Sequence, residues 1–570
     1  MIFLIIASLI FLVLSVWRPA WAVFLIVLCL PTYQIRFHVF GLPTTWLEIM
    51  IGILFIVWLI NKIKNQKLKV KITNQNLKLN NWLVIILLWL AVSLVAIFIS
   101  PDRLGALGFW RAYFLEPILL VLVLIDLAGR DPDIRMHSNG TNIHENKNEV
   151  NNNLGGPISC TKKSAETADS RGSRYSTINP GLVPNTRIAN LNNLSRQSVD
   201  NFLGRGPAGN RTPETPVPTR FPYHTRPTAK LLYYNFKHSQ LFNGSKPALI
   251  LFGLALSALY CSIWAILQKW LGGGVMSTEV LGAPKVWRAT GPFPQPNFLG
   301  LYLGPIIVLC FGQIINLWRE GKKYSFPYIF YLITFILSFT AILAARSEGA
   351  IIGVLAGLIF LALWFKKGRW PIIIIVVVLI LFVLILPTTR SWLAQITYQK
   401  LSGQLRLNIW QGTLAMIKTH PFFGVGLRGY QKLAPQYQEP YYSPQTKQLV
   451  SVETHPYPHN LFLAIWVELG ILGLIVFLWI LVKFFYQGFS NIIQTIQTYP
   501  TRSFDRSPRR MTGANTLNRF FIIFILAAMM VILVHGSVDT PYFKNDLAVL
   551  FWLIIGLLIV ETGKAVNRTT

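Results

Sequence analysis

Long apolar runs recur along this chain of 570 residues. Each run is about 16–25 residues long, the length of a helix that crosses a hydrocarbon core roughly 30 Å thick. Hydrophobic residues make up 53% of the sequence and charged residues 13%. The predicted fold class is therefore all-α and integral to a membrane, a polytopic helical bundle of about 12–13 transmembrane helices. The expected spans are residues 2–16, 20–38, 46–61, 82–100, 112–127, 247–267, 297–317, 326–344, 349–366, 370–387, 459–485, 519–536 and 545–561.

Basic residues predict how these helices are oriented. Short basic loops lie at Lys62–Lys78, Trp318–Lys323 and Lys366–Arg369, and counting spans places all three on one face. Such loops face the cytoplasm, so the net charge of +30 is read as a topology signal, and no nucleic-acid partner is expected. The chain is expected to be a multi-pass protein of the cytoplasmic membrane. The loops expected to face outward are 101–111, 268–296, 344–348, 388–458 and 537–544.

Residues 128–245 differ from the rest of the chain. They are rich in Asn, Pro, Gly, Ser, Thr and Arg and lack helical periodicity, a composition that cannot bury enough apolar surface to fold. We expect a disordered cytoplasmic insert, which is either a basic segment for anionic lipid or an insertion without a role. The predicted division is 1–127 for the N-terminal transmembrane helices, 128–245 for the insert, 246–387 for further transmembrane helices, 388–458 for a large outward loop, and 459–570 for the C-terminal transmembrane helices with a basic cytoplasmic loop near 486–518.

The sequence lacks the motifs of several common classes of membrane protein. Its four cysteines form no CxxC pair, so neither a zinc site nor a disulfide framework is indicated. There is no P-loop, no GxGxxG after a strand, and no carboxylate cluster suited to Mg²⁺. No metal and no cofactor are expected, and an ATP-driven pump is poorly supported.

The outward loop 388–458 combines a helix signal with a glycine-rich turn. Leu407, Trp410, Leu414 and Ile417 recur at helical spacing and predict an amphipathic helix along the outer interface. Three glycines then follow within the six residues "GVGLRG". They permit either close approach of two backbones or a cradle for phosphate.

Two histidines stand just before the span that follows this loop. His455 and His459 are four residues apart, a spacing that would bind a metal ion on a helix. Pro456 and Pro458 forbid a regular helix between them, so this reading fails. His459 begins the span on its outer side, where an imidazole stays wet enough to titrate. Glu468 lies about 180° around the helix from His459, and we expect it to hydrogen-bond to another span.

These residues resemble the signature of the O-antigen ligase and O-antigen polymerase family. The matching elements are Arg406-x-x-x-Trp410, His420-Pro-Phe-Phe-Gly424-Val-Gly426, His459-Asn460-x-x-Leu463 and Glu468-x-Gly470-x-x-Gly473. Upstream, Arg288-Ala-Thr-Gly291-Pro-Phe293-Pro-Gln-Pro296-Asn297 is similar to the family's outward Pro-Asn element. Ala345-Arg346-Ser347-Glu348-Gly349 resembles its arginine at the outer end of a helix, although the family more often has Ser before that arginine. The resemblance covers about 245–560 well, 1–127 by hydropathy alone, and 128–245 not at all.

The resemblance implies a GT-C-like bundle and a metal-independent glycosyltransferase. Such enzymes move a glycan from undecaprenyl pyrophosphate to an acceptor hydroxyl of a lipid, glycan or protein. The reaction takes place on the outer face of the cytoplasmic membrane, in the assembly of cell-surface polysaccharide. The departing pyrophosphate needs cations, which arginine supplies with bidentate geometry. The attacking hydroxyl needs a base, which histidine supplies near neutral pH.

Four residues are predicted to fill these roles. His459 is the predicted general base, with a helix-capping hydrogen bond as its alternative. Arg346 and Arg406 are predicted to bind the donor pyrophosphate, although an arginine at a helix end can also simply reach the membrane interface. Arg288 is predicted either to contact the donor headgroup or to set the topology.

Several neighbouring polar residues are expected to lie outside the chemistry. His455 is given a minor role, because the two prolines should direct it away from His459. Arg111 and Glu116 are expected to stabilise each other or a neighbour. Arg428 is expected to be solvated in its loop.

The alternative function is a membrane transporter, such as a lipid-linked glycan flippase or a small-anion carrier. A carrier should keep ionisable groups near the middle of the membrane and contain paired broken helices. The predicted spans are largely free of charge, and the charged groups gather on one outer face, which favours the glycosyltransferase. Ligase and polymerase share these motifs, so the sequence does not separate them.

Overall fold

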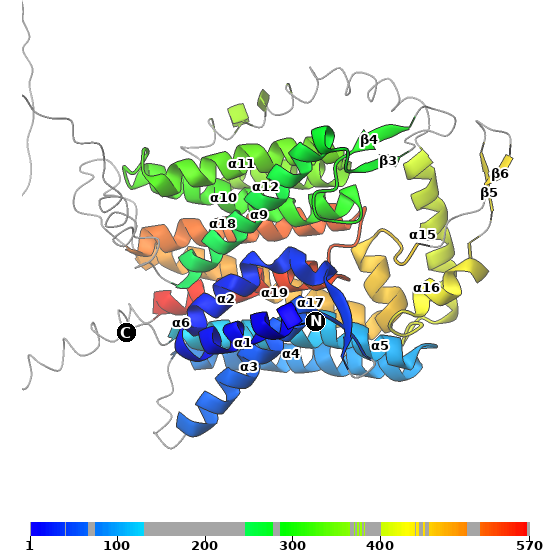
Figure 1. Cartoon of the computed structure of the whole chain (residues 1–570), viewed down its shortest axis with the longest axis horizontal. Coiled ribbons are helices and arrows are strands. Elements are labelled where there is room, and N and C mark those ends of the chain that lie inside the picture. The colour runs from blue at the N-terminus through cyan, green and yellow to red at the C-terminus, as the bar shows by residue number, and fades with distance from the viewer. Residues whose placement is uncertain are drawn as a thin grey trace, which may run out of the picture. The chain divides into compact units, whose positions relative to one another are not determined.

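Apolar helices dominate the part of the chain that the structure describes (Figure 1). The first half contains α1 (Ile2–Trp17), α2 (Pro19–Leu28), α3 (Trp46–Asn65), α4 (Asn74–Ile99), α5 (Arg103–Trp110) and α6 (Glu116–Gly129). The second half contains α9 (Lys246–Leu271), α10 (Pro296–Arg319), α11 (Phe326–Ala345), α12 (Glu348–Trp364), α15 (Leu401–Thr419), α16 (Gly429–Leu433), α17 (Leu461–Thr498), α18 (Ala514–Gly536) and α19 (Asn545–Val566).

The structure is a computed structural model. It describes residues 2–39, 42–65, 74–129, 246–277, 285–364, 401–438, 440–443, 448–450, 455–498 and 514–566, with 370, 373–375, 377–378 and 381. These residues belong to one unit, Met1–Met136 with Phe236–Thr570. The expected insert, apart from its first two residues, and most of the expected span 370–387 lie outside the described residues.

Most described helices fall where the apolar runs predicted them, but α5 occupies the expected loop 101–111 and α17 continues to Thr498, into the expected loop 486–518. Eight described helices are long and apolar enough to cross a membrane. Four shorter apolar helices bring the number of apolar helices among the described residues to twelve. The prediction of a polytopic all-α membrane protein is therefore confirmed. The extent of the second expected span, 20–38, is wrong, because α2 ends at Leu28 and Pro31 lies in the following turn η1 (Leu30–Gln34). Proline cannot donate the hydrogen bond that would continue the helix.

Small hairpins and loops gather at one end of the bundle, which we call the hairpin end. The antiparallel hairpins pair β1 (Arg36–Val39) with β2 (Leu42–Thr45), β3 (Val275–Ser277) with β4 (Val286–Arg288), and β5 (Tyr441–Ser443) with β6 (Gln448–Val450). Hydrogen bonds join loops of this end: Gln34 donates to the Pro292 carbonyl, and Lys544 donates to the Tyr33 hydroxyl at 3.1 Å. Helices α15 and α16 lie at the same end, to the right in Figure 1. The opposite, basic end carries Lys62, Lys64, Arg319, Lys322 and Lys323.

The last helix forms the centre of the bundle. Every residue from Asp539 to Gly563 is buried, and α19 packs against α4, α6, α17 and α18. A helix that is apolar on all sides must be enclosed by other elements. The residues at its start, which lie at the hairpin end, are therefore held by neighbours on every side.

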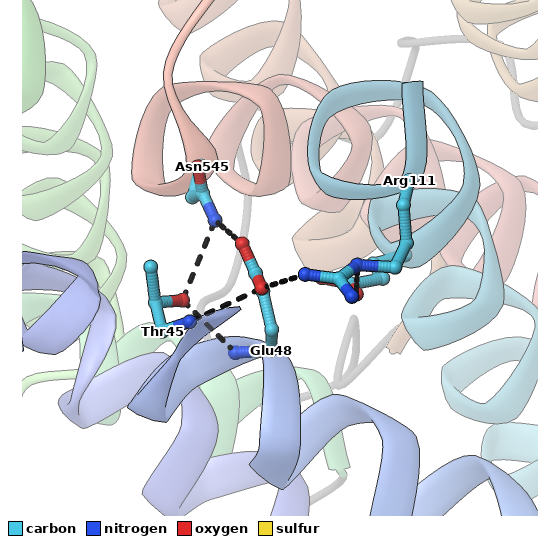
Figure 2. Close-up of polar contacts among 5 residues, drawn as sticks. Thr45, Glu48, Arg111 and Asn545 are labelled. Atoms are coloured by element: carbon cyan, nitrogen blue, oxygen red, sulfur yellow. Dashed lines mark hydrogen bonds and ion pairs between the residues drawn. The ribbon is translucent and has the colours of Figure 1, made fainter. Parts of the chain in front are cut away.

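A polar network fixes the start of α19 to two other helices (Figure 2). Thr45 and Glu48 form a capping box at the start of α3, because the Thr45 N–H donates to the Glu48 carboxylate at 3.1 Å and the Glu48 N–H donates to Thr45 Oγ1 at 3.3 Å. Asn545 Nδ2 donates to the same carboxylate at 2.6 Å, and the Arg111 guanidinium pairs with its other oxygen. The network therefore joins α3, the segment before α6, and α19.

Arg111 also pairs with Glu116, as the sequence predicted. Arg111 Nε lies 3.2 Å from Glu116 Oε1. In a regular α-helix, residues five apart do not face each other, but the segment Arg111–Leu115 is a π-helical turn, η2. A π turn closes hydrogen bonds between residues five apart and so aligns them.

Helix α17 is broken at Gly470, whose φ of 72° and ψ of −175° are not helical. Residues 421–427, which we call the plug, enter this break. The Val425 N–H donates to the Val467 carbonyl at 2.7 Å, and the Ile471 N–H donates to the Pro421 carbonyl at 3.0 Å. The end of the plug also reaches α4, where the Leu427 N–H donates to the Ala96 carbonyl at 3.2 Å. The plug therefore replaces the helical hydrogen bonds that the break removes.

The glycines of the plug are required by close backbone contacts. Gly424 has a φ of 69°, and a Cβ there would lie 2.5 Å from the Val467 carbonyl oxygen. Gly426 has a φ of 81°, and a Cβ there would collide with the backbone of Ser100. Of the two readings of "GVGLRG", close approach of two backbones is the one observed. Protein backbone occupies the space beside these glycines.

Two expectations near the plug are wrong. Glu468 is buried, but it accepts a hydrogen bond from the backbone N–H of Arg428, so its observed partner is the turn after the plug and not another span. The Arg428 guanidinium is not simply solvated, because it lies 3.1 Å from the Asp102 carboxylate. Asp102 caps the N-terminus of α5. Both contacts fasten the plug to the bundle.

Helix α15 packs through a face that differs from the predicted one. Ile417 is buried as expected, but Leu407 and Leu414 are 57% and 43% exposed. The buried residues beside Ile417 are Ile409, Thr413 and Met416. Met416 and Ile417 join Val425, Tyr430, Ala434 and Val467 in a small core between α15, α16 and α17. Contact with these elements, rather than the apolar stripe alone, decides which face turns inward.

The break at Gly470 predicts that this position tolerates no side chain. In Gly470→Ala, the new Cβ would collide with the Phe422 carbonyl oxygen, and the positive φ would strain an L residue. We expect a clear fall in melting temperature of the detergent-solubilised protein. Gly52→Ala is the matched control, because nothing lies within 4 Å of a Cβ in that helix, and alanine favours a helix by roughly 0.5–1 kcal/mol. A Gly470→Ala variant as stable as Gly52→Ala would contradict a fixed break.

The network at the start of α19 predicts a stability effect of Arg111. Arg111→Met would leave the buried carboxylates of Glu48 and Glu116 without their shared cation. Breaking such a pair costs up to roughly 3–5 kcal/mol, so the melting temperature should fall strongly. Lys322→Ala is the control, because its pair with Glu320 is more exposed and is worth about 1 kcal/mol or less. Equal losses in the two variants would argue against the network.

Candidate functional site

Three non-glycine residues in the described part of the chain have left-handed backbone conformations. They are Arg346, Arg428 and His459, with φ of 49°, 63° and 48°. Such a conformation costs about 1–3 kcal/mol and persists where the surrounding structure enforces it, often at functional sites. Two of the three are residues that the sequence predicts to act on substrate. The fold therefore holds Arg346 and His459 in fixed, strained positions.

His459 lies just before α17, and its neighbour caps that helix. Asn460 Oδ1 accepts hydrogen bonds from the N–H groups of Phe462 and Leu463 at 3.0 and 3.1 Å, which is the usual role of an N-cap residue. Asn460 Nδ2 also donates to the Ser537 carbonyl at 2.9 Å. The capping role considered for His459 is thus filled by Asn460.

The imidazole of His459 pairs instead with Asp539. His459 Nδ1 lies 3.2 Å from Asp539 Oδ1, and the two side chains are 20% and 4% exposed. Asp539 belongs to the loop between α18 and α19, and its Oδ1 also accepts the Thr540 N–H at 2.8 Å. A ring held at Nδ1 by a carboxylate is oriented so that Nε2 can accept a proton. The arrangement suits a general base.

Asp539 remains ionised despite its burial. Burial alone would raise its pKa, but the hydrogen bond and charge of His459, together with His535 and the Thr540 N–H, outweigh it. The pKa of Asp539 is therefore held well below its usual value. The carboxylate is available to orient the imidazole across the whole neutral range.

His455 lies beside His459, contrary to the sequence expectation. The two rings are 4.9 Å apart between centroids, with an interplanar angle of 74°. Residues 455–460 are non-helical, as Pro456 and Pro458 require. The prolines prevent a helix, but the turn they create brings the rings together.

Arg346 ends α11 at a position that usually belongs to glycine. The Ser347 N–H bonds to the Ile342 carbonyl and the Arg346 N–H to the Leu343 carbonyl, which is the pattern of a Schellman motif. Glycine is favoured in this left-handed position because it has no Cβ. An arginine here carries a conformational cost, which indicates a role for its side chain beyond ending the helix.

Arg288 supports the turn that carries Arg346. Its Nε donates to the Ala345 carbonyl at 2.9 Å, and its Nη2 donates to the Arg346 carbonyl at 3.2 Å and to Asn297 Oδ1 at 2.9 Å. The last carbonyls of a helix lack partners within the helix, and Arg288 supplies them. This places Arg288 as a support for Arg346, in addition to the donor contact predicted for it.

Arg406 is positioned by α15, one turn before Trp410. Trp410 Nε1 donates to the Pro458 carbonyl at 2.9 Å, which ties this helix to the residue before His459. The charge of Arg406 also acts on His535, near the end of α18. Arg406 therefore belongs to the same end of the bundle as the His459–Asp539 pair.

Three residues of the segment 535–546 lie at this site but were not predicted from the sequence. These are His535, Asp539 and Lys544, and all three are buried. Lys544 lies over the Phe298 ring, and burial lowers its pKa although the charges of Asp546 and Asp539 act to raise it. The available signal was a dense run of titratable and aromatic residues, "HGSVDTPYFKND", between two apolar helices. An isolated loop of this kind has no visible partner in the sequence.

Part of the chain matches one known protein family. Residues 333–478 match the family model described as O-antigen ligase. The matched stretch contains Arg346, Arg406 and His459, whereas Arg288 and Asp539 lie outside it. No curated protein sequence matches the chain. The chain is therefore a polytopic α-helical membrane protein that carries, at residues 333–478, the domain of the O-antigen ligase family.

Proposed function

We propose that this glycosyltransferase of the O-antigen ligase type moves a glycan from undecaprenyl pyrophosphate to an acceptor hydroxyl at the hairpin end, and that this end faces outward from the cytoplasmic membrane. The observation that carries the proposal is the strained backbone of Arg346 and His459. The two residues come from distant parts of the chain and lie at one end of the bundle. Arg406 joins them through the hydrogen bond from Trp410 to Pro458.

The base in this proposal is His459. Its Nε2 removes the proton of the acceptor hydroxyl as the new bond forms between that oxygen and the anomeric carbon of the donor sugar. The bond from the anomeric carbon to the pyrophosphate oxygen breaks, and its electron pair leaves with the lipid pyrophosphate. Asp539 stabilises the imidazolium that results, because an ionised carboxylate favours the charged ring. The proton then passes from the ring to solvent.

The leaving group in this proposal is neutralised by arginine. Arg346 and Arg406 are permanently charged and can bind phosphate oxygens in pairs. The departing pyrophosphate gains negative charge in the transition state, so cations fixed in advance lower the barrier. Arg288 keeps the Arg346 turn in place through its hydrogen bonds to the Ala345 and Arg346 carbonyls.

One feature of the structure, a broken helix, is typical of transporters, but the contacts around the break do not favour a transporter. Broken helices line the ion sites of many carriers, where freed backbone groups bind the ion. Here α17 is broken at Gly470, but Val425 and Pro421 of the plug pair with the freed backbone groups of Val467 and Ile471. The break therefore serves to hold the plug. The glycosyltransferase remains the better supported function.

The proposed orientation predicts opposite labelling of the two ends. In a background without the native cysteines, Gln436→Cys places a thiol at the hairpin end and Lys323→Cys places one at the basic end, and both positions are exposed. An impermeant maleimide should label Gln436→Cys in intact cells and Lys323→Cys only after permeabilisation. The reverse pattern would overturn the outward location of the site.

The proposed chemistry predicts that replacing the base lowers turnover, whereas replacing an arginine weakens donor binding. With an undecaprenyl-pyrophosphate glycan in liposomes, His459→Ala should lower the release of lipid pyrophosphate by at least about 10²-fold while donor binding survives. Arg406→Ala should weaken donor binding, and Arg406→Lys should recover only part of it, because lysine lacks the planar fork. Wild-type turnover should fall as the pH drops, since a protonated imidazole accepts no proton.

The control for His459 is His38→Ala, an exposed histidine of β1 at the same end. It should bind donor and turn over like the wild type. Normal turnover of His459→Ala, or loss of donor binding together with turnover, would remove His459 from the role of base.

A further inference from the structure

His535 is a buried side chain that lies against one half of the site and interacts electrostatically with the other. Its exposed fraction is 2%. The ring lies directly on Gly349, in the first turn of α12, because a Cβ on Gly349 would lie 2.5 Å from the ring Cδ2 and 2.7 Å from Nε2. Gly349 follows the Arg346 turn by three residues. The glycine of the motif "ARSEG" is therefore required by the imidazole of His535.

The other neighbour of His535 is the partner of the base. His535 lies four residues before Asp539, and the two groups interact electrostatically. The charged groups that act on His535 are Asp539 and Arg406, while its α12 neighbours Gly349 and Gly353 carry no charge. His535 thus stands between the turn that carries Arg346 and the carboxylate that orients His459.

Packing alone does not account for a histidine at this position. Within the described residues, His535 Nδ1 and Asp539 Oδ2 are buried without a hydrogen-bond partner. An unpaired buried polar atom costs about 1–3 kcal/mol. An apolar ring would fill the same space without that cost. A polar ring kept here at a loss of stability points to a role in the site.

We propose that His535 is a positioning residue that sets the separation between the Arg346 turn and Asp539, and hence between the bound pyrophosphate and the base. The proposal rests on the function proposed above. A movement of the first turn of α12 would press on the ring, and the backbone would pass the displacement from His535 to Asp539, four residues later, through the turn in which the Val538 N–H donates to the His535 carbonyl at 3.1 Å. Donor binding at Arg346 would in this way align His459 for the acceptor.

The contact predicts a specific pattern in a double-mutant cycle. Gly349→Ala forces the ring away, and His535→Ala removes it, so each should lower turnover by about 10-fold to 10²-fold, the loss expected for a misplacement near 1 Å. In the double variant, the new methyl group meets no ring and its nearest remaining neighbour is Val538 Cγ2, at 3.1 Å, so turnover should be near that of His535→Ala alone. Independent effects would instead multiply. Gly52→Ala is the control and should turn over normally.

Two further measurements separate positioning from general loss of structure. Donor binding should stay within about twofold in all variants that fold, and the loss in His535→Ala should appear in kcat rather than in the KM for the donor, because the pyrophosphate is still held while the base is misplaced. His535→Gln, which keeps a polar group and more of the volume, replaces His535→Ala if the alanine variant does not fold. Multiplicative losses, or a loss of donor binding that accompanies the fall in turnover, would overturn the proposal.

The same cycle measured by melting temperature does not depend on the reaction. Gly349→Ala should destabilise the wild type much more than it destabilises His535→Ala, in which the nearest remaining neighbour of the new Cβ is Val538 Cγ2, at 3.1 Å. A wild-type protein that transfers no glycan would overturn the proposed function and the role of His535 in it. The melting temperatures would still show whether the ring presses on Gly349, and additive shifts would refute the contact itself.

Discussion

The structure depends on the requirement that every backbone N–H and C=O within a bilayer be paired inside the protein. Helices satisfy this requirement by themselves, and α17 violates it at Gly470. The plug restores the missing hydrogen bonds at Val467 and Ile471. Because the plug follows α15 directly, the repair of one helix also fixes the position of another. Because Arg406 lies on α15, the same backbone hydrogen bonds also fix the position of its positive charge in the site.

The helices could be predicted from the sequence because the bilayer sets their length and polarity. The exceptions have local physical causes. Pro31 shortens the second span, and no apolar periodicity reveals it. Leu407 and Leu414 satisfy a helical stripe, but the face that α15 buries is chosen by the small core around Val425 and Tyr430. The break in α17 lies in a run that reads as one apolar helix. Its cause is a segment more than forty residues earlier, and contacts of that range are invisible to local patterns.

The candidate site shows the same division. The resemblance to the family's motifs singled out Arg346, Arg406 and His459, and the structure places them at one end of the bundle, while their roles remain predictions. Asp539 could not be chosen, because its partner lies 80 residues away in sequence. His455 was expected to point elsewhere, and only the folded turn brings it to 4.9 Å from His459. Arg288 was predicted only to contact the donor headgroup or to set the topology. Its hydrogen bonds to the Ala345 and Arg346 carbonyls add a second role, the support of the Arg346 turn.

The left-handed residues also mark where helices begin. Arg346 stands two residues before α12, and His459 stands two residues before α17. The N-terminus of a helix carries a partial positive charge from its aligned peptide dipoles, worth typically about 0.3–1 kcal/mol to a nearby anion. This charge belongs to the backbone, so neither pH nor the replacement of a side chain removes it. The backbone therefore makes a small positive contribution to the potential at this end of the bundle that does not depend on the arginines.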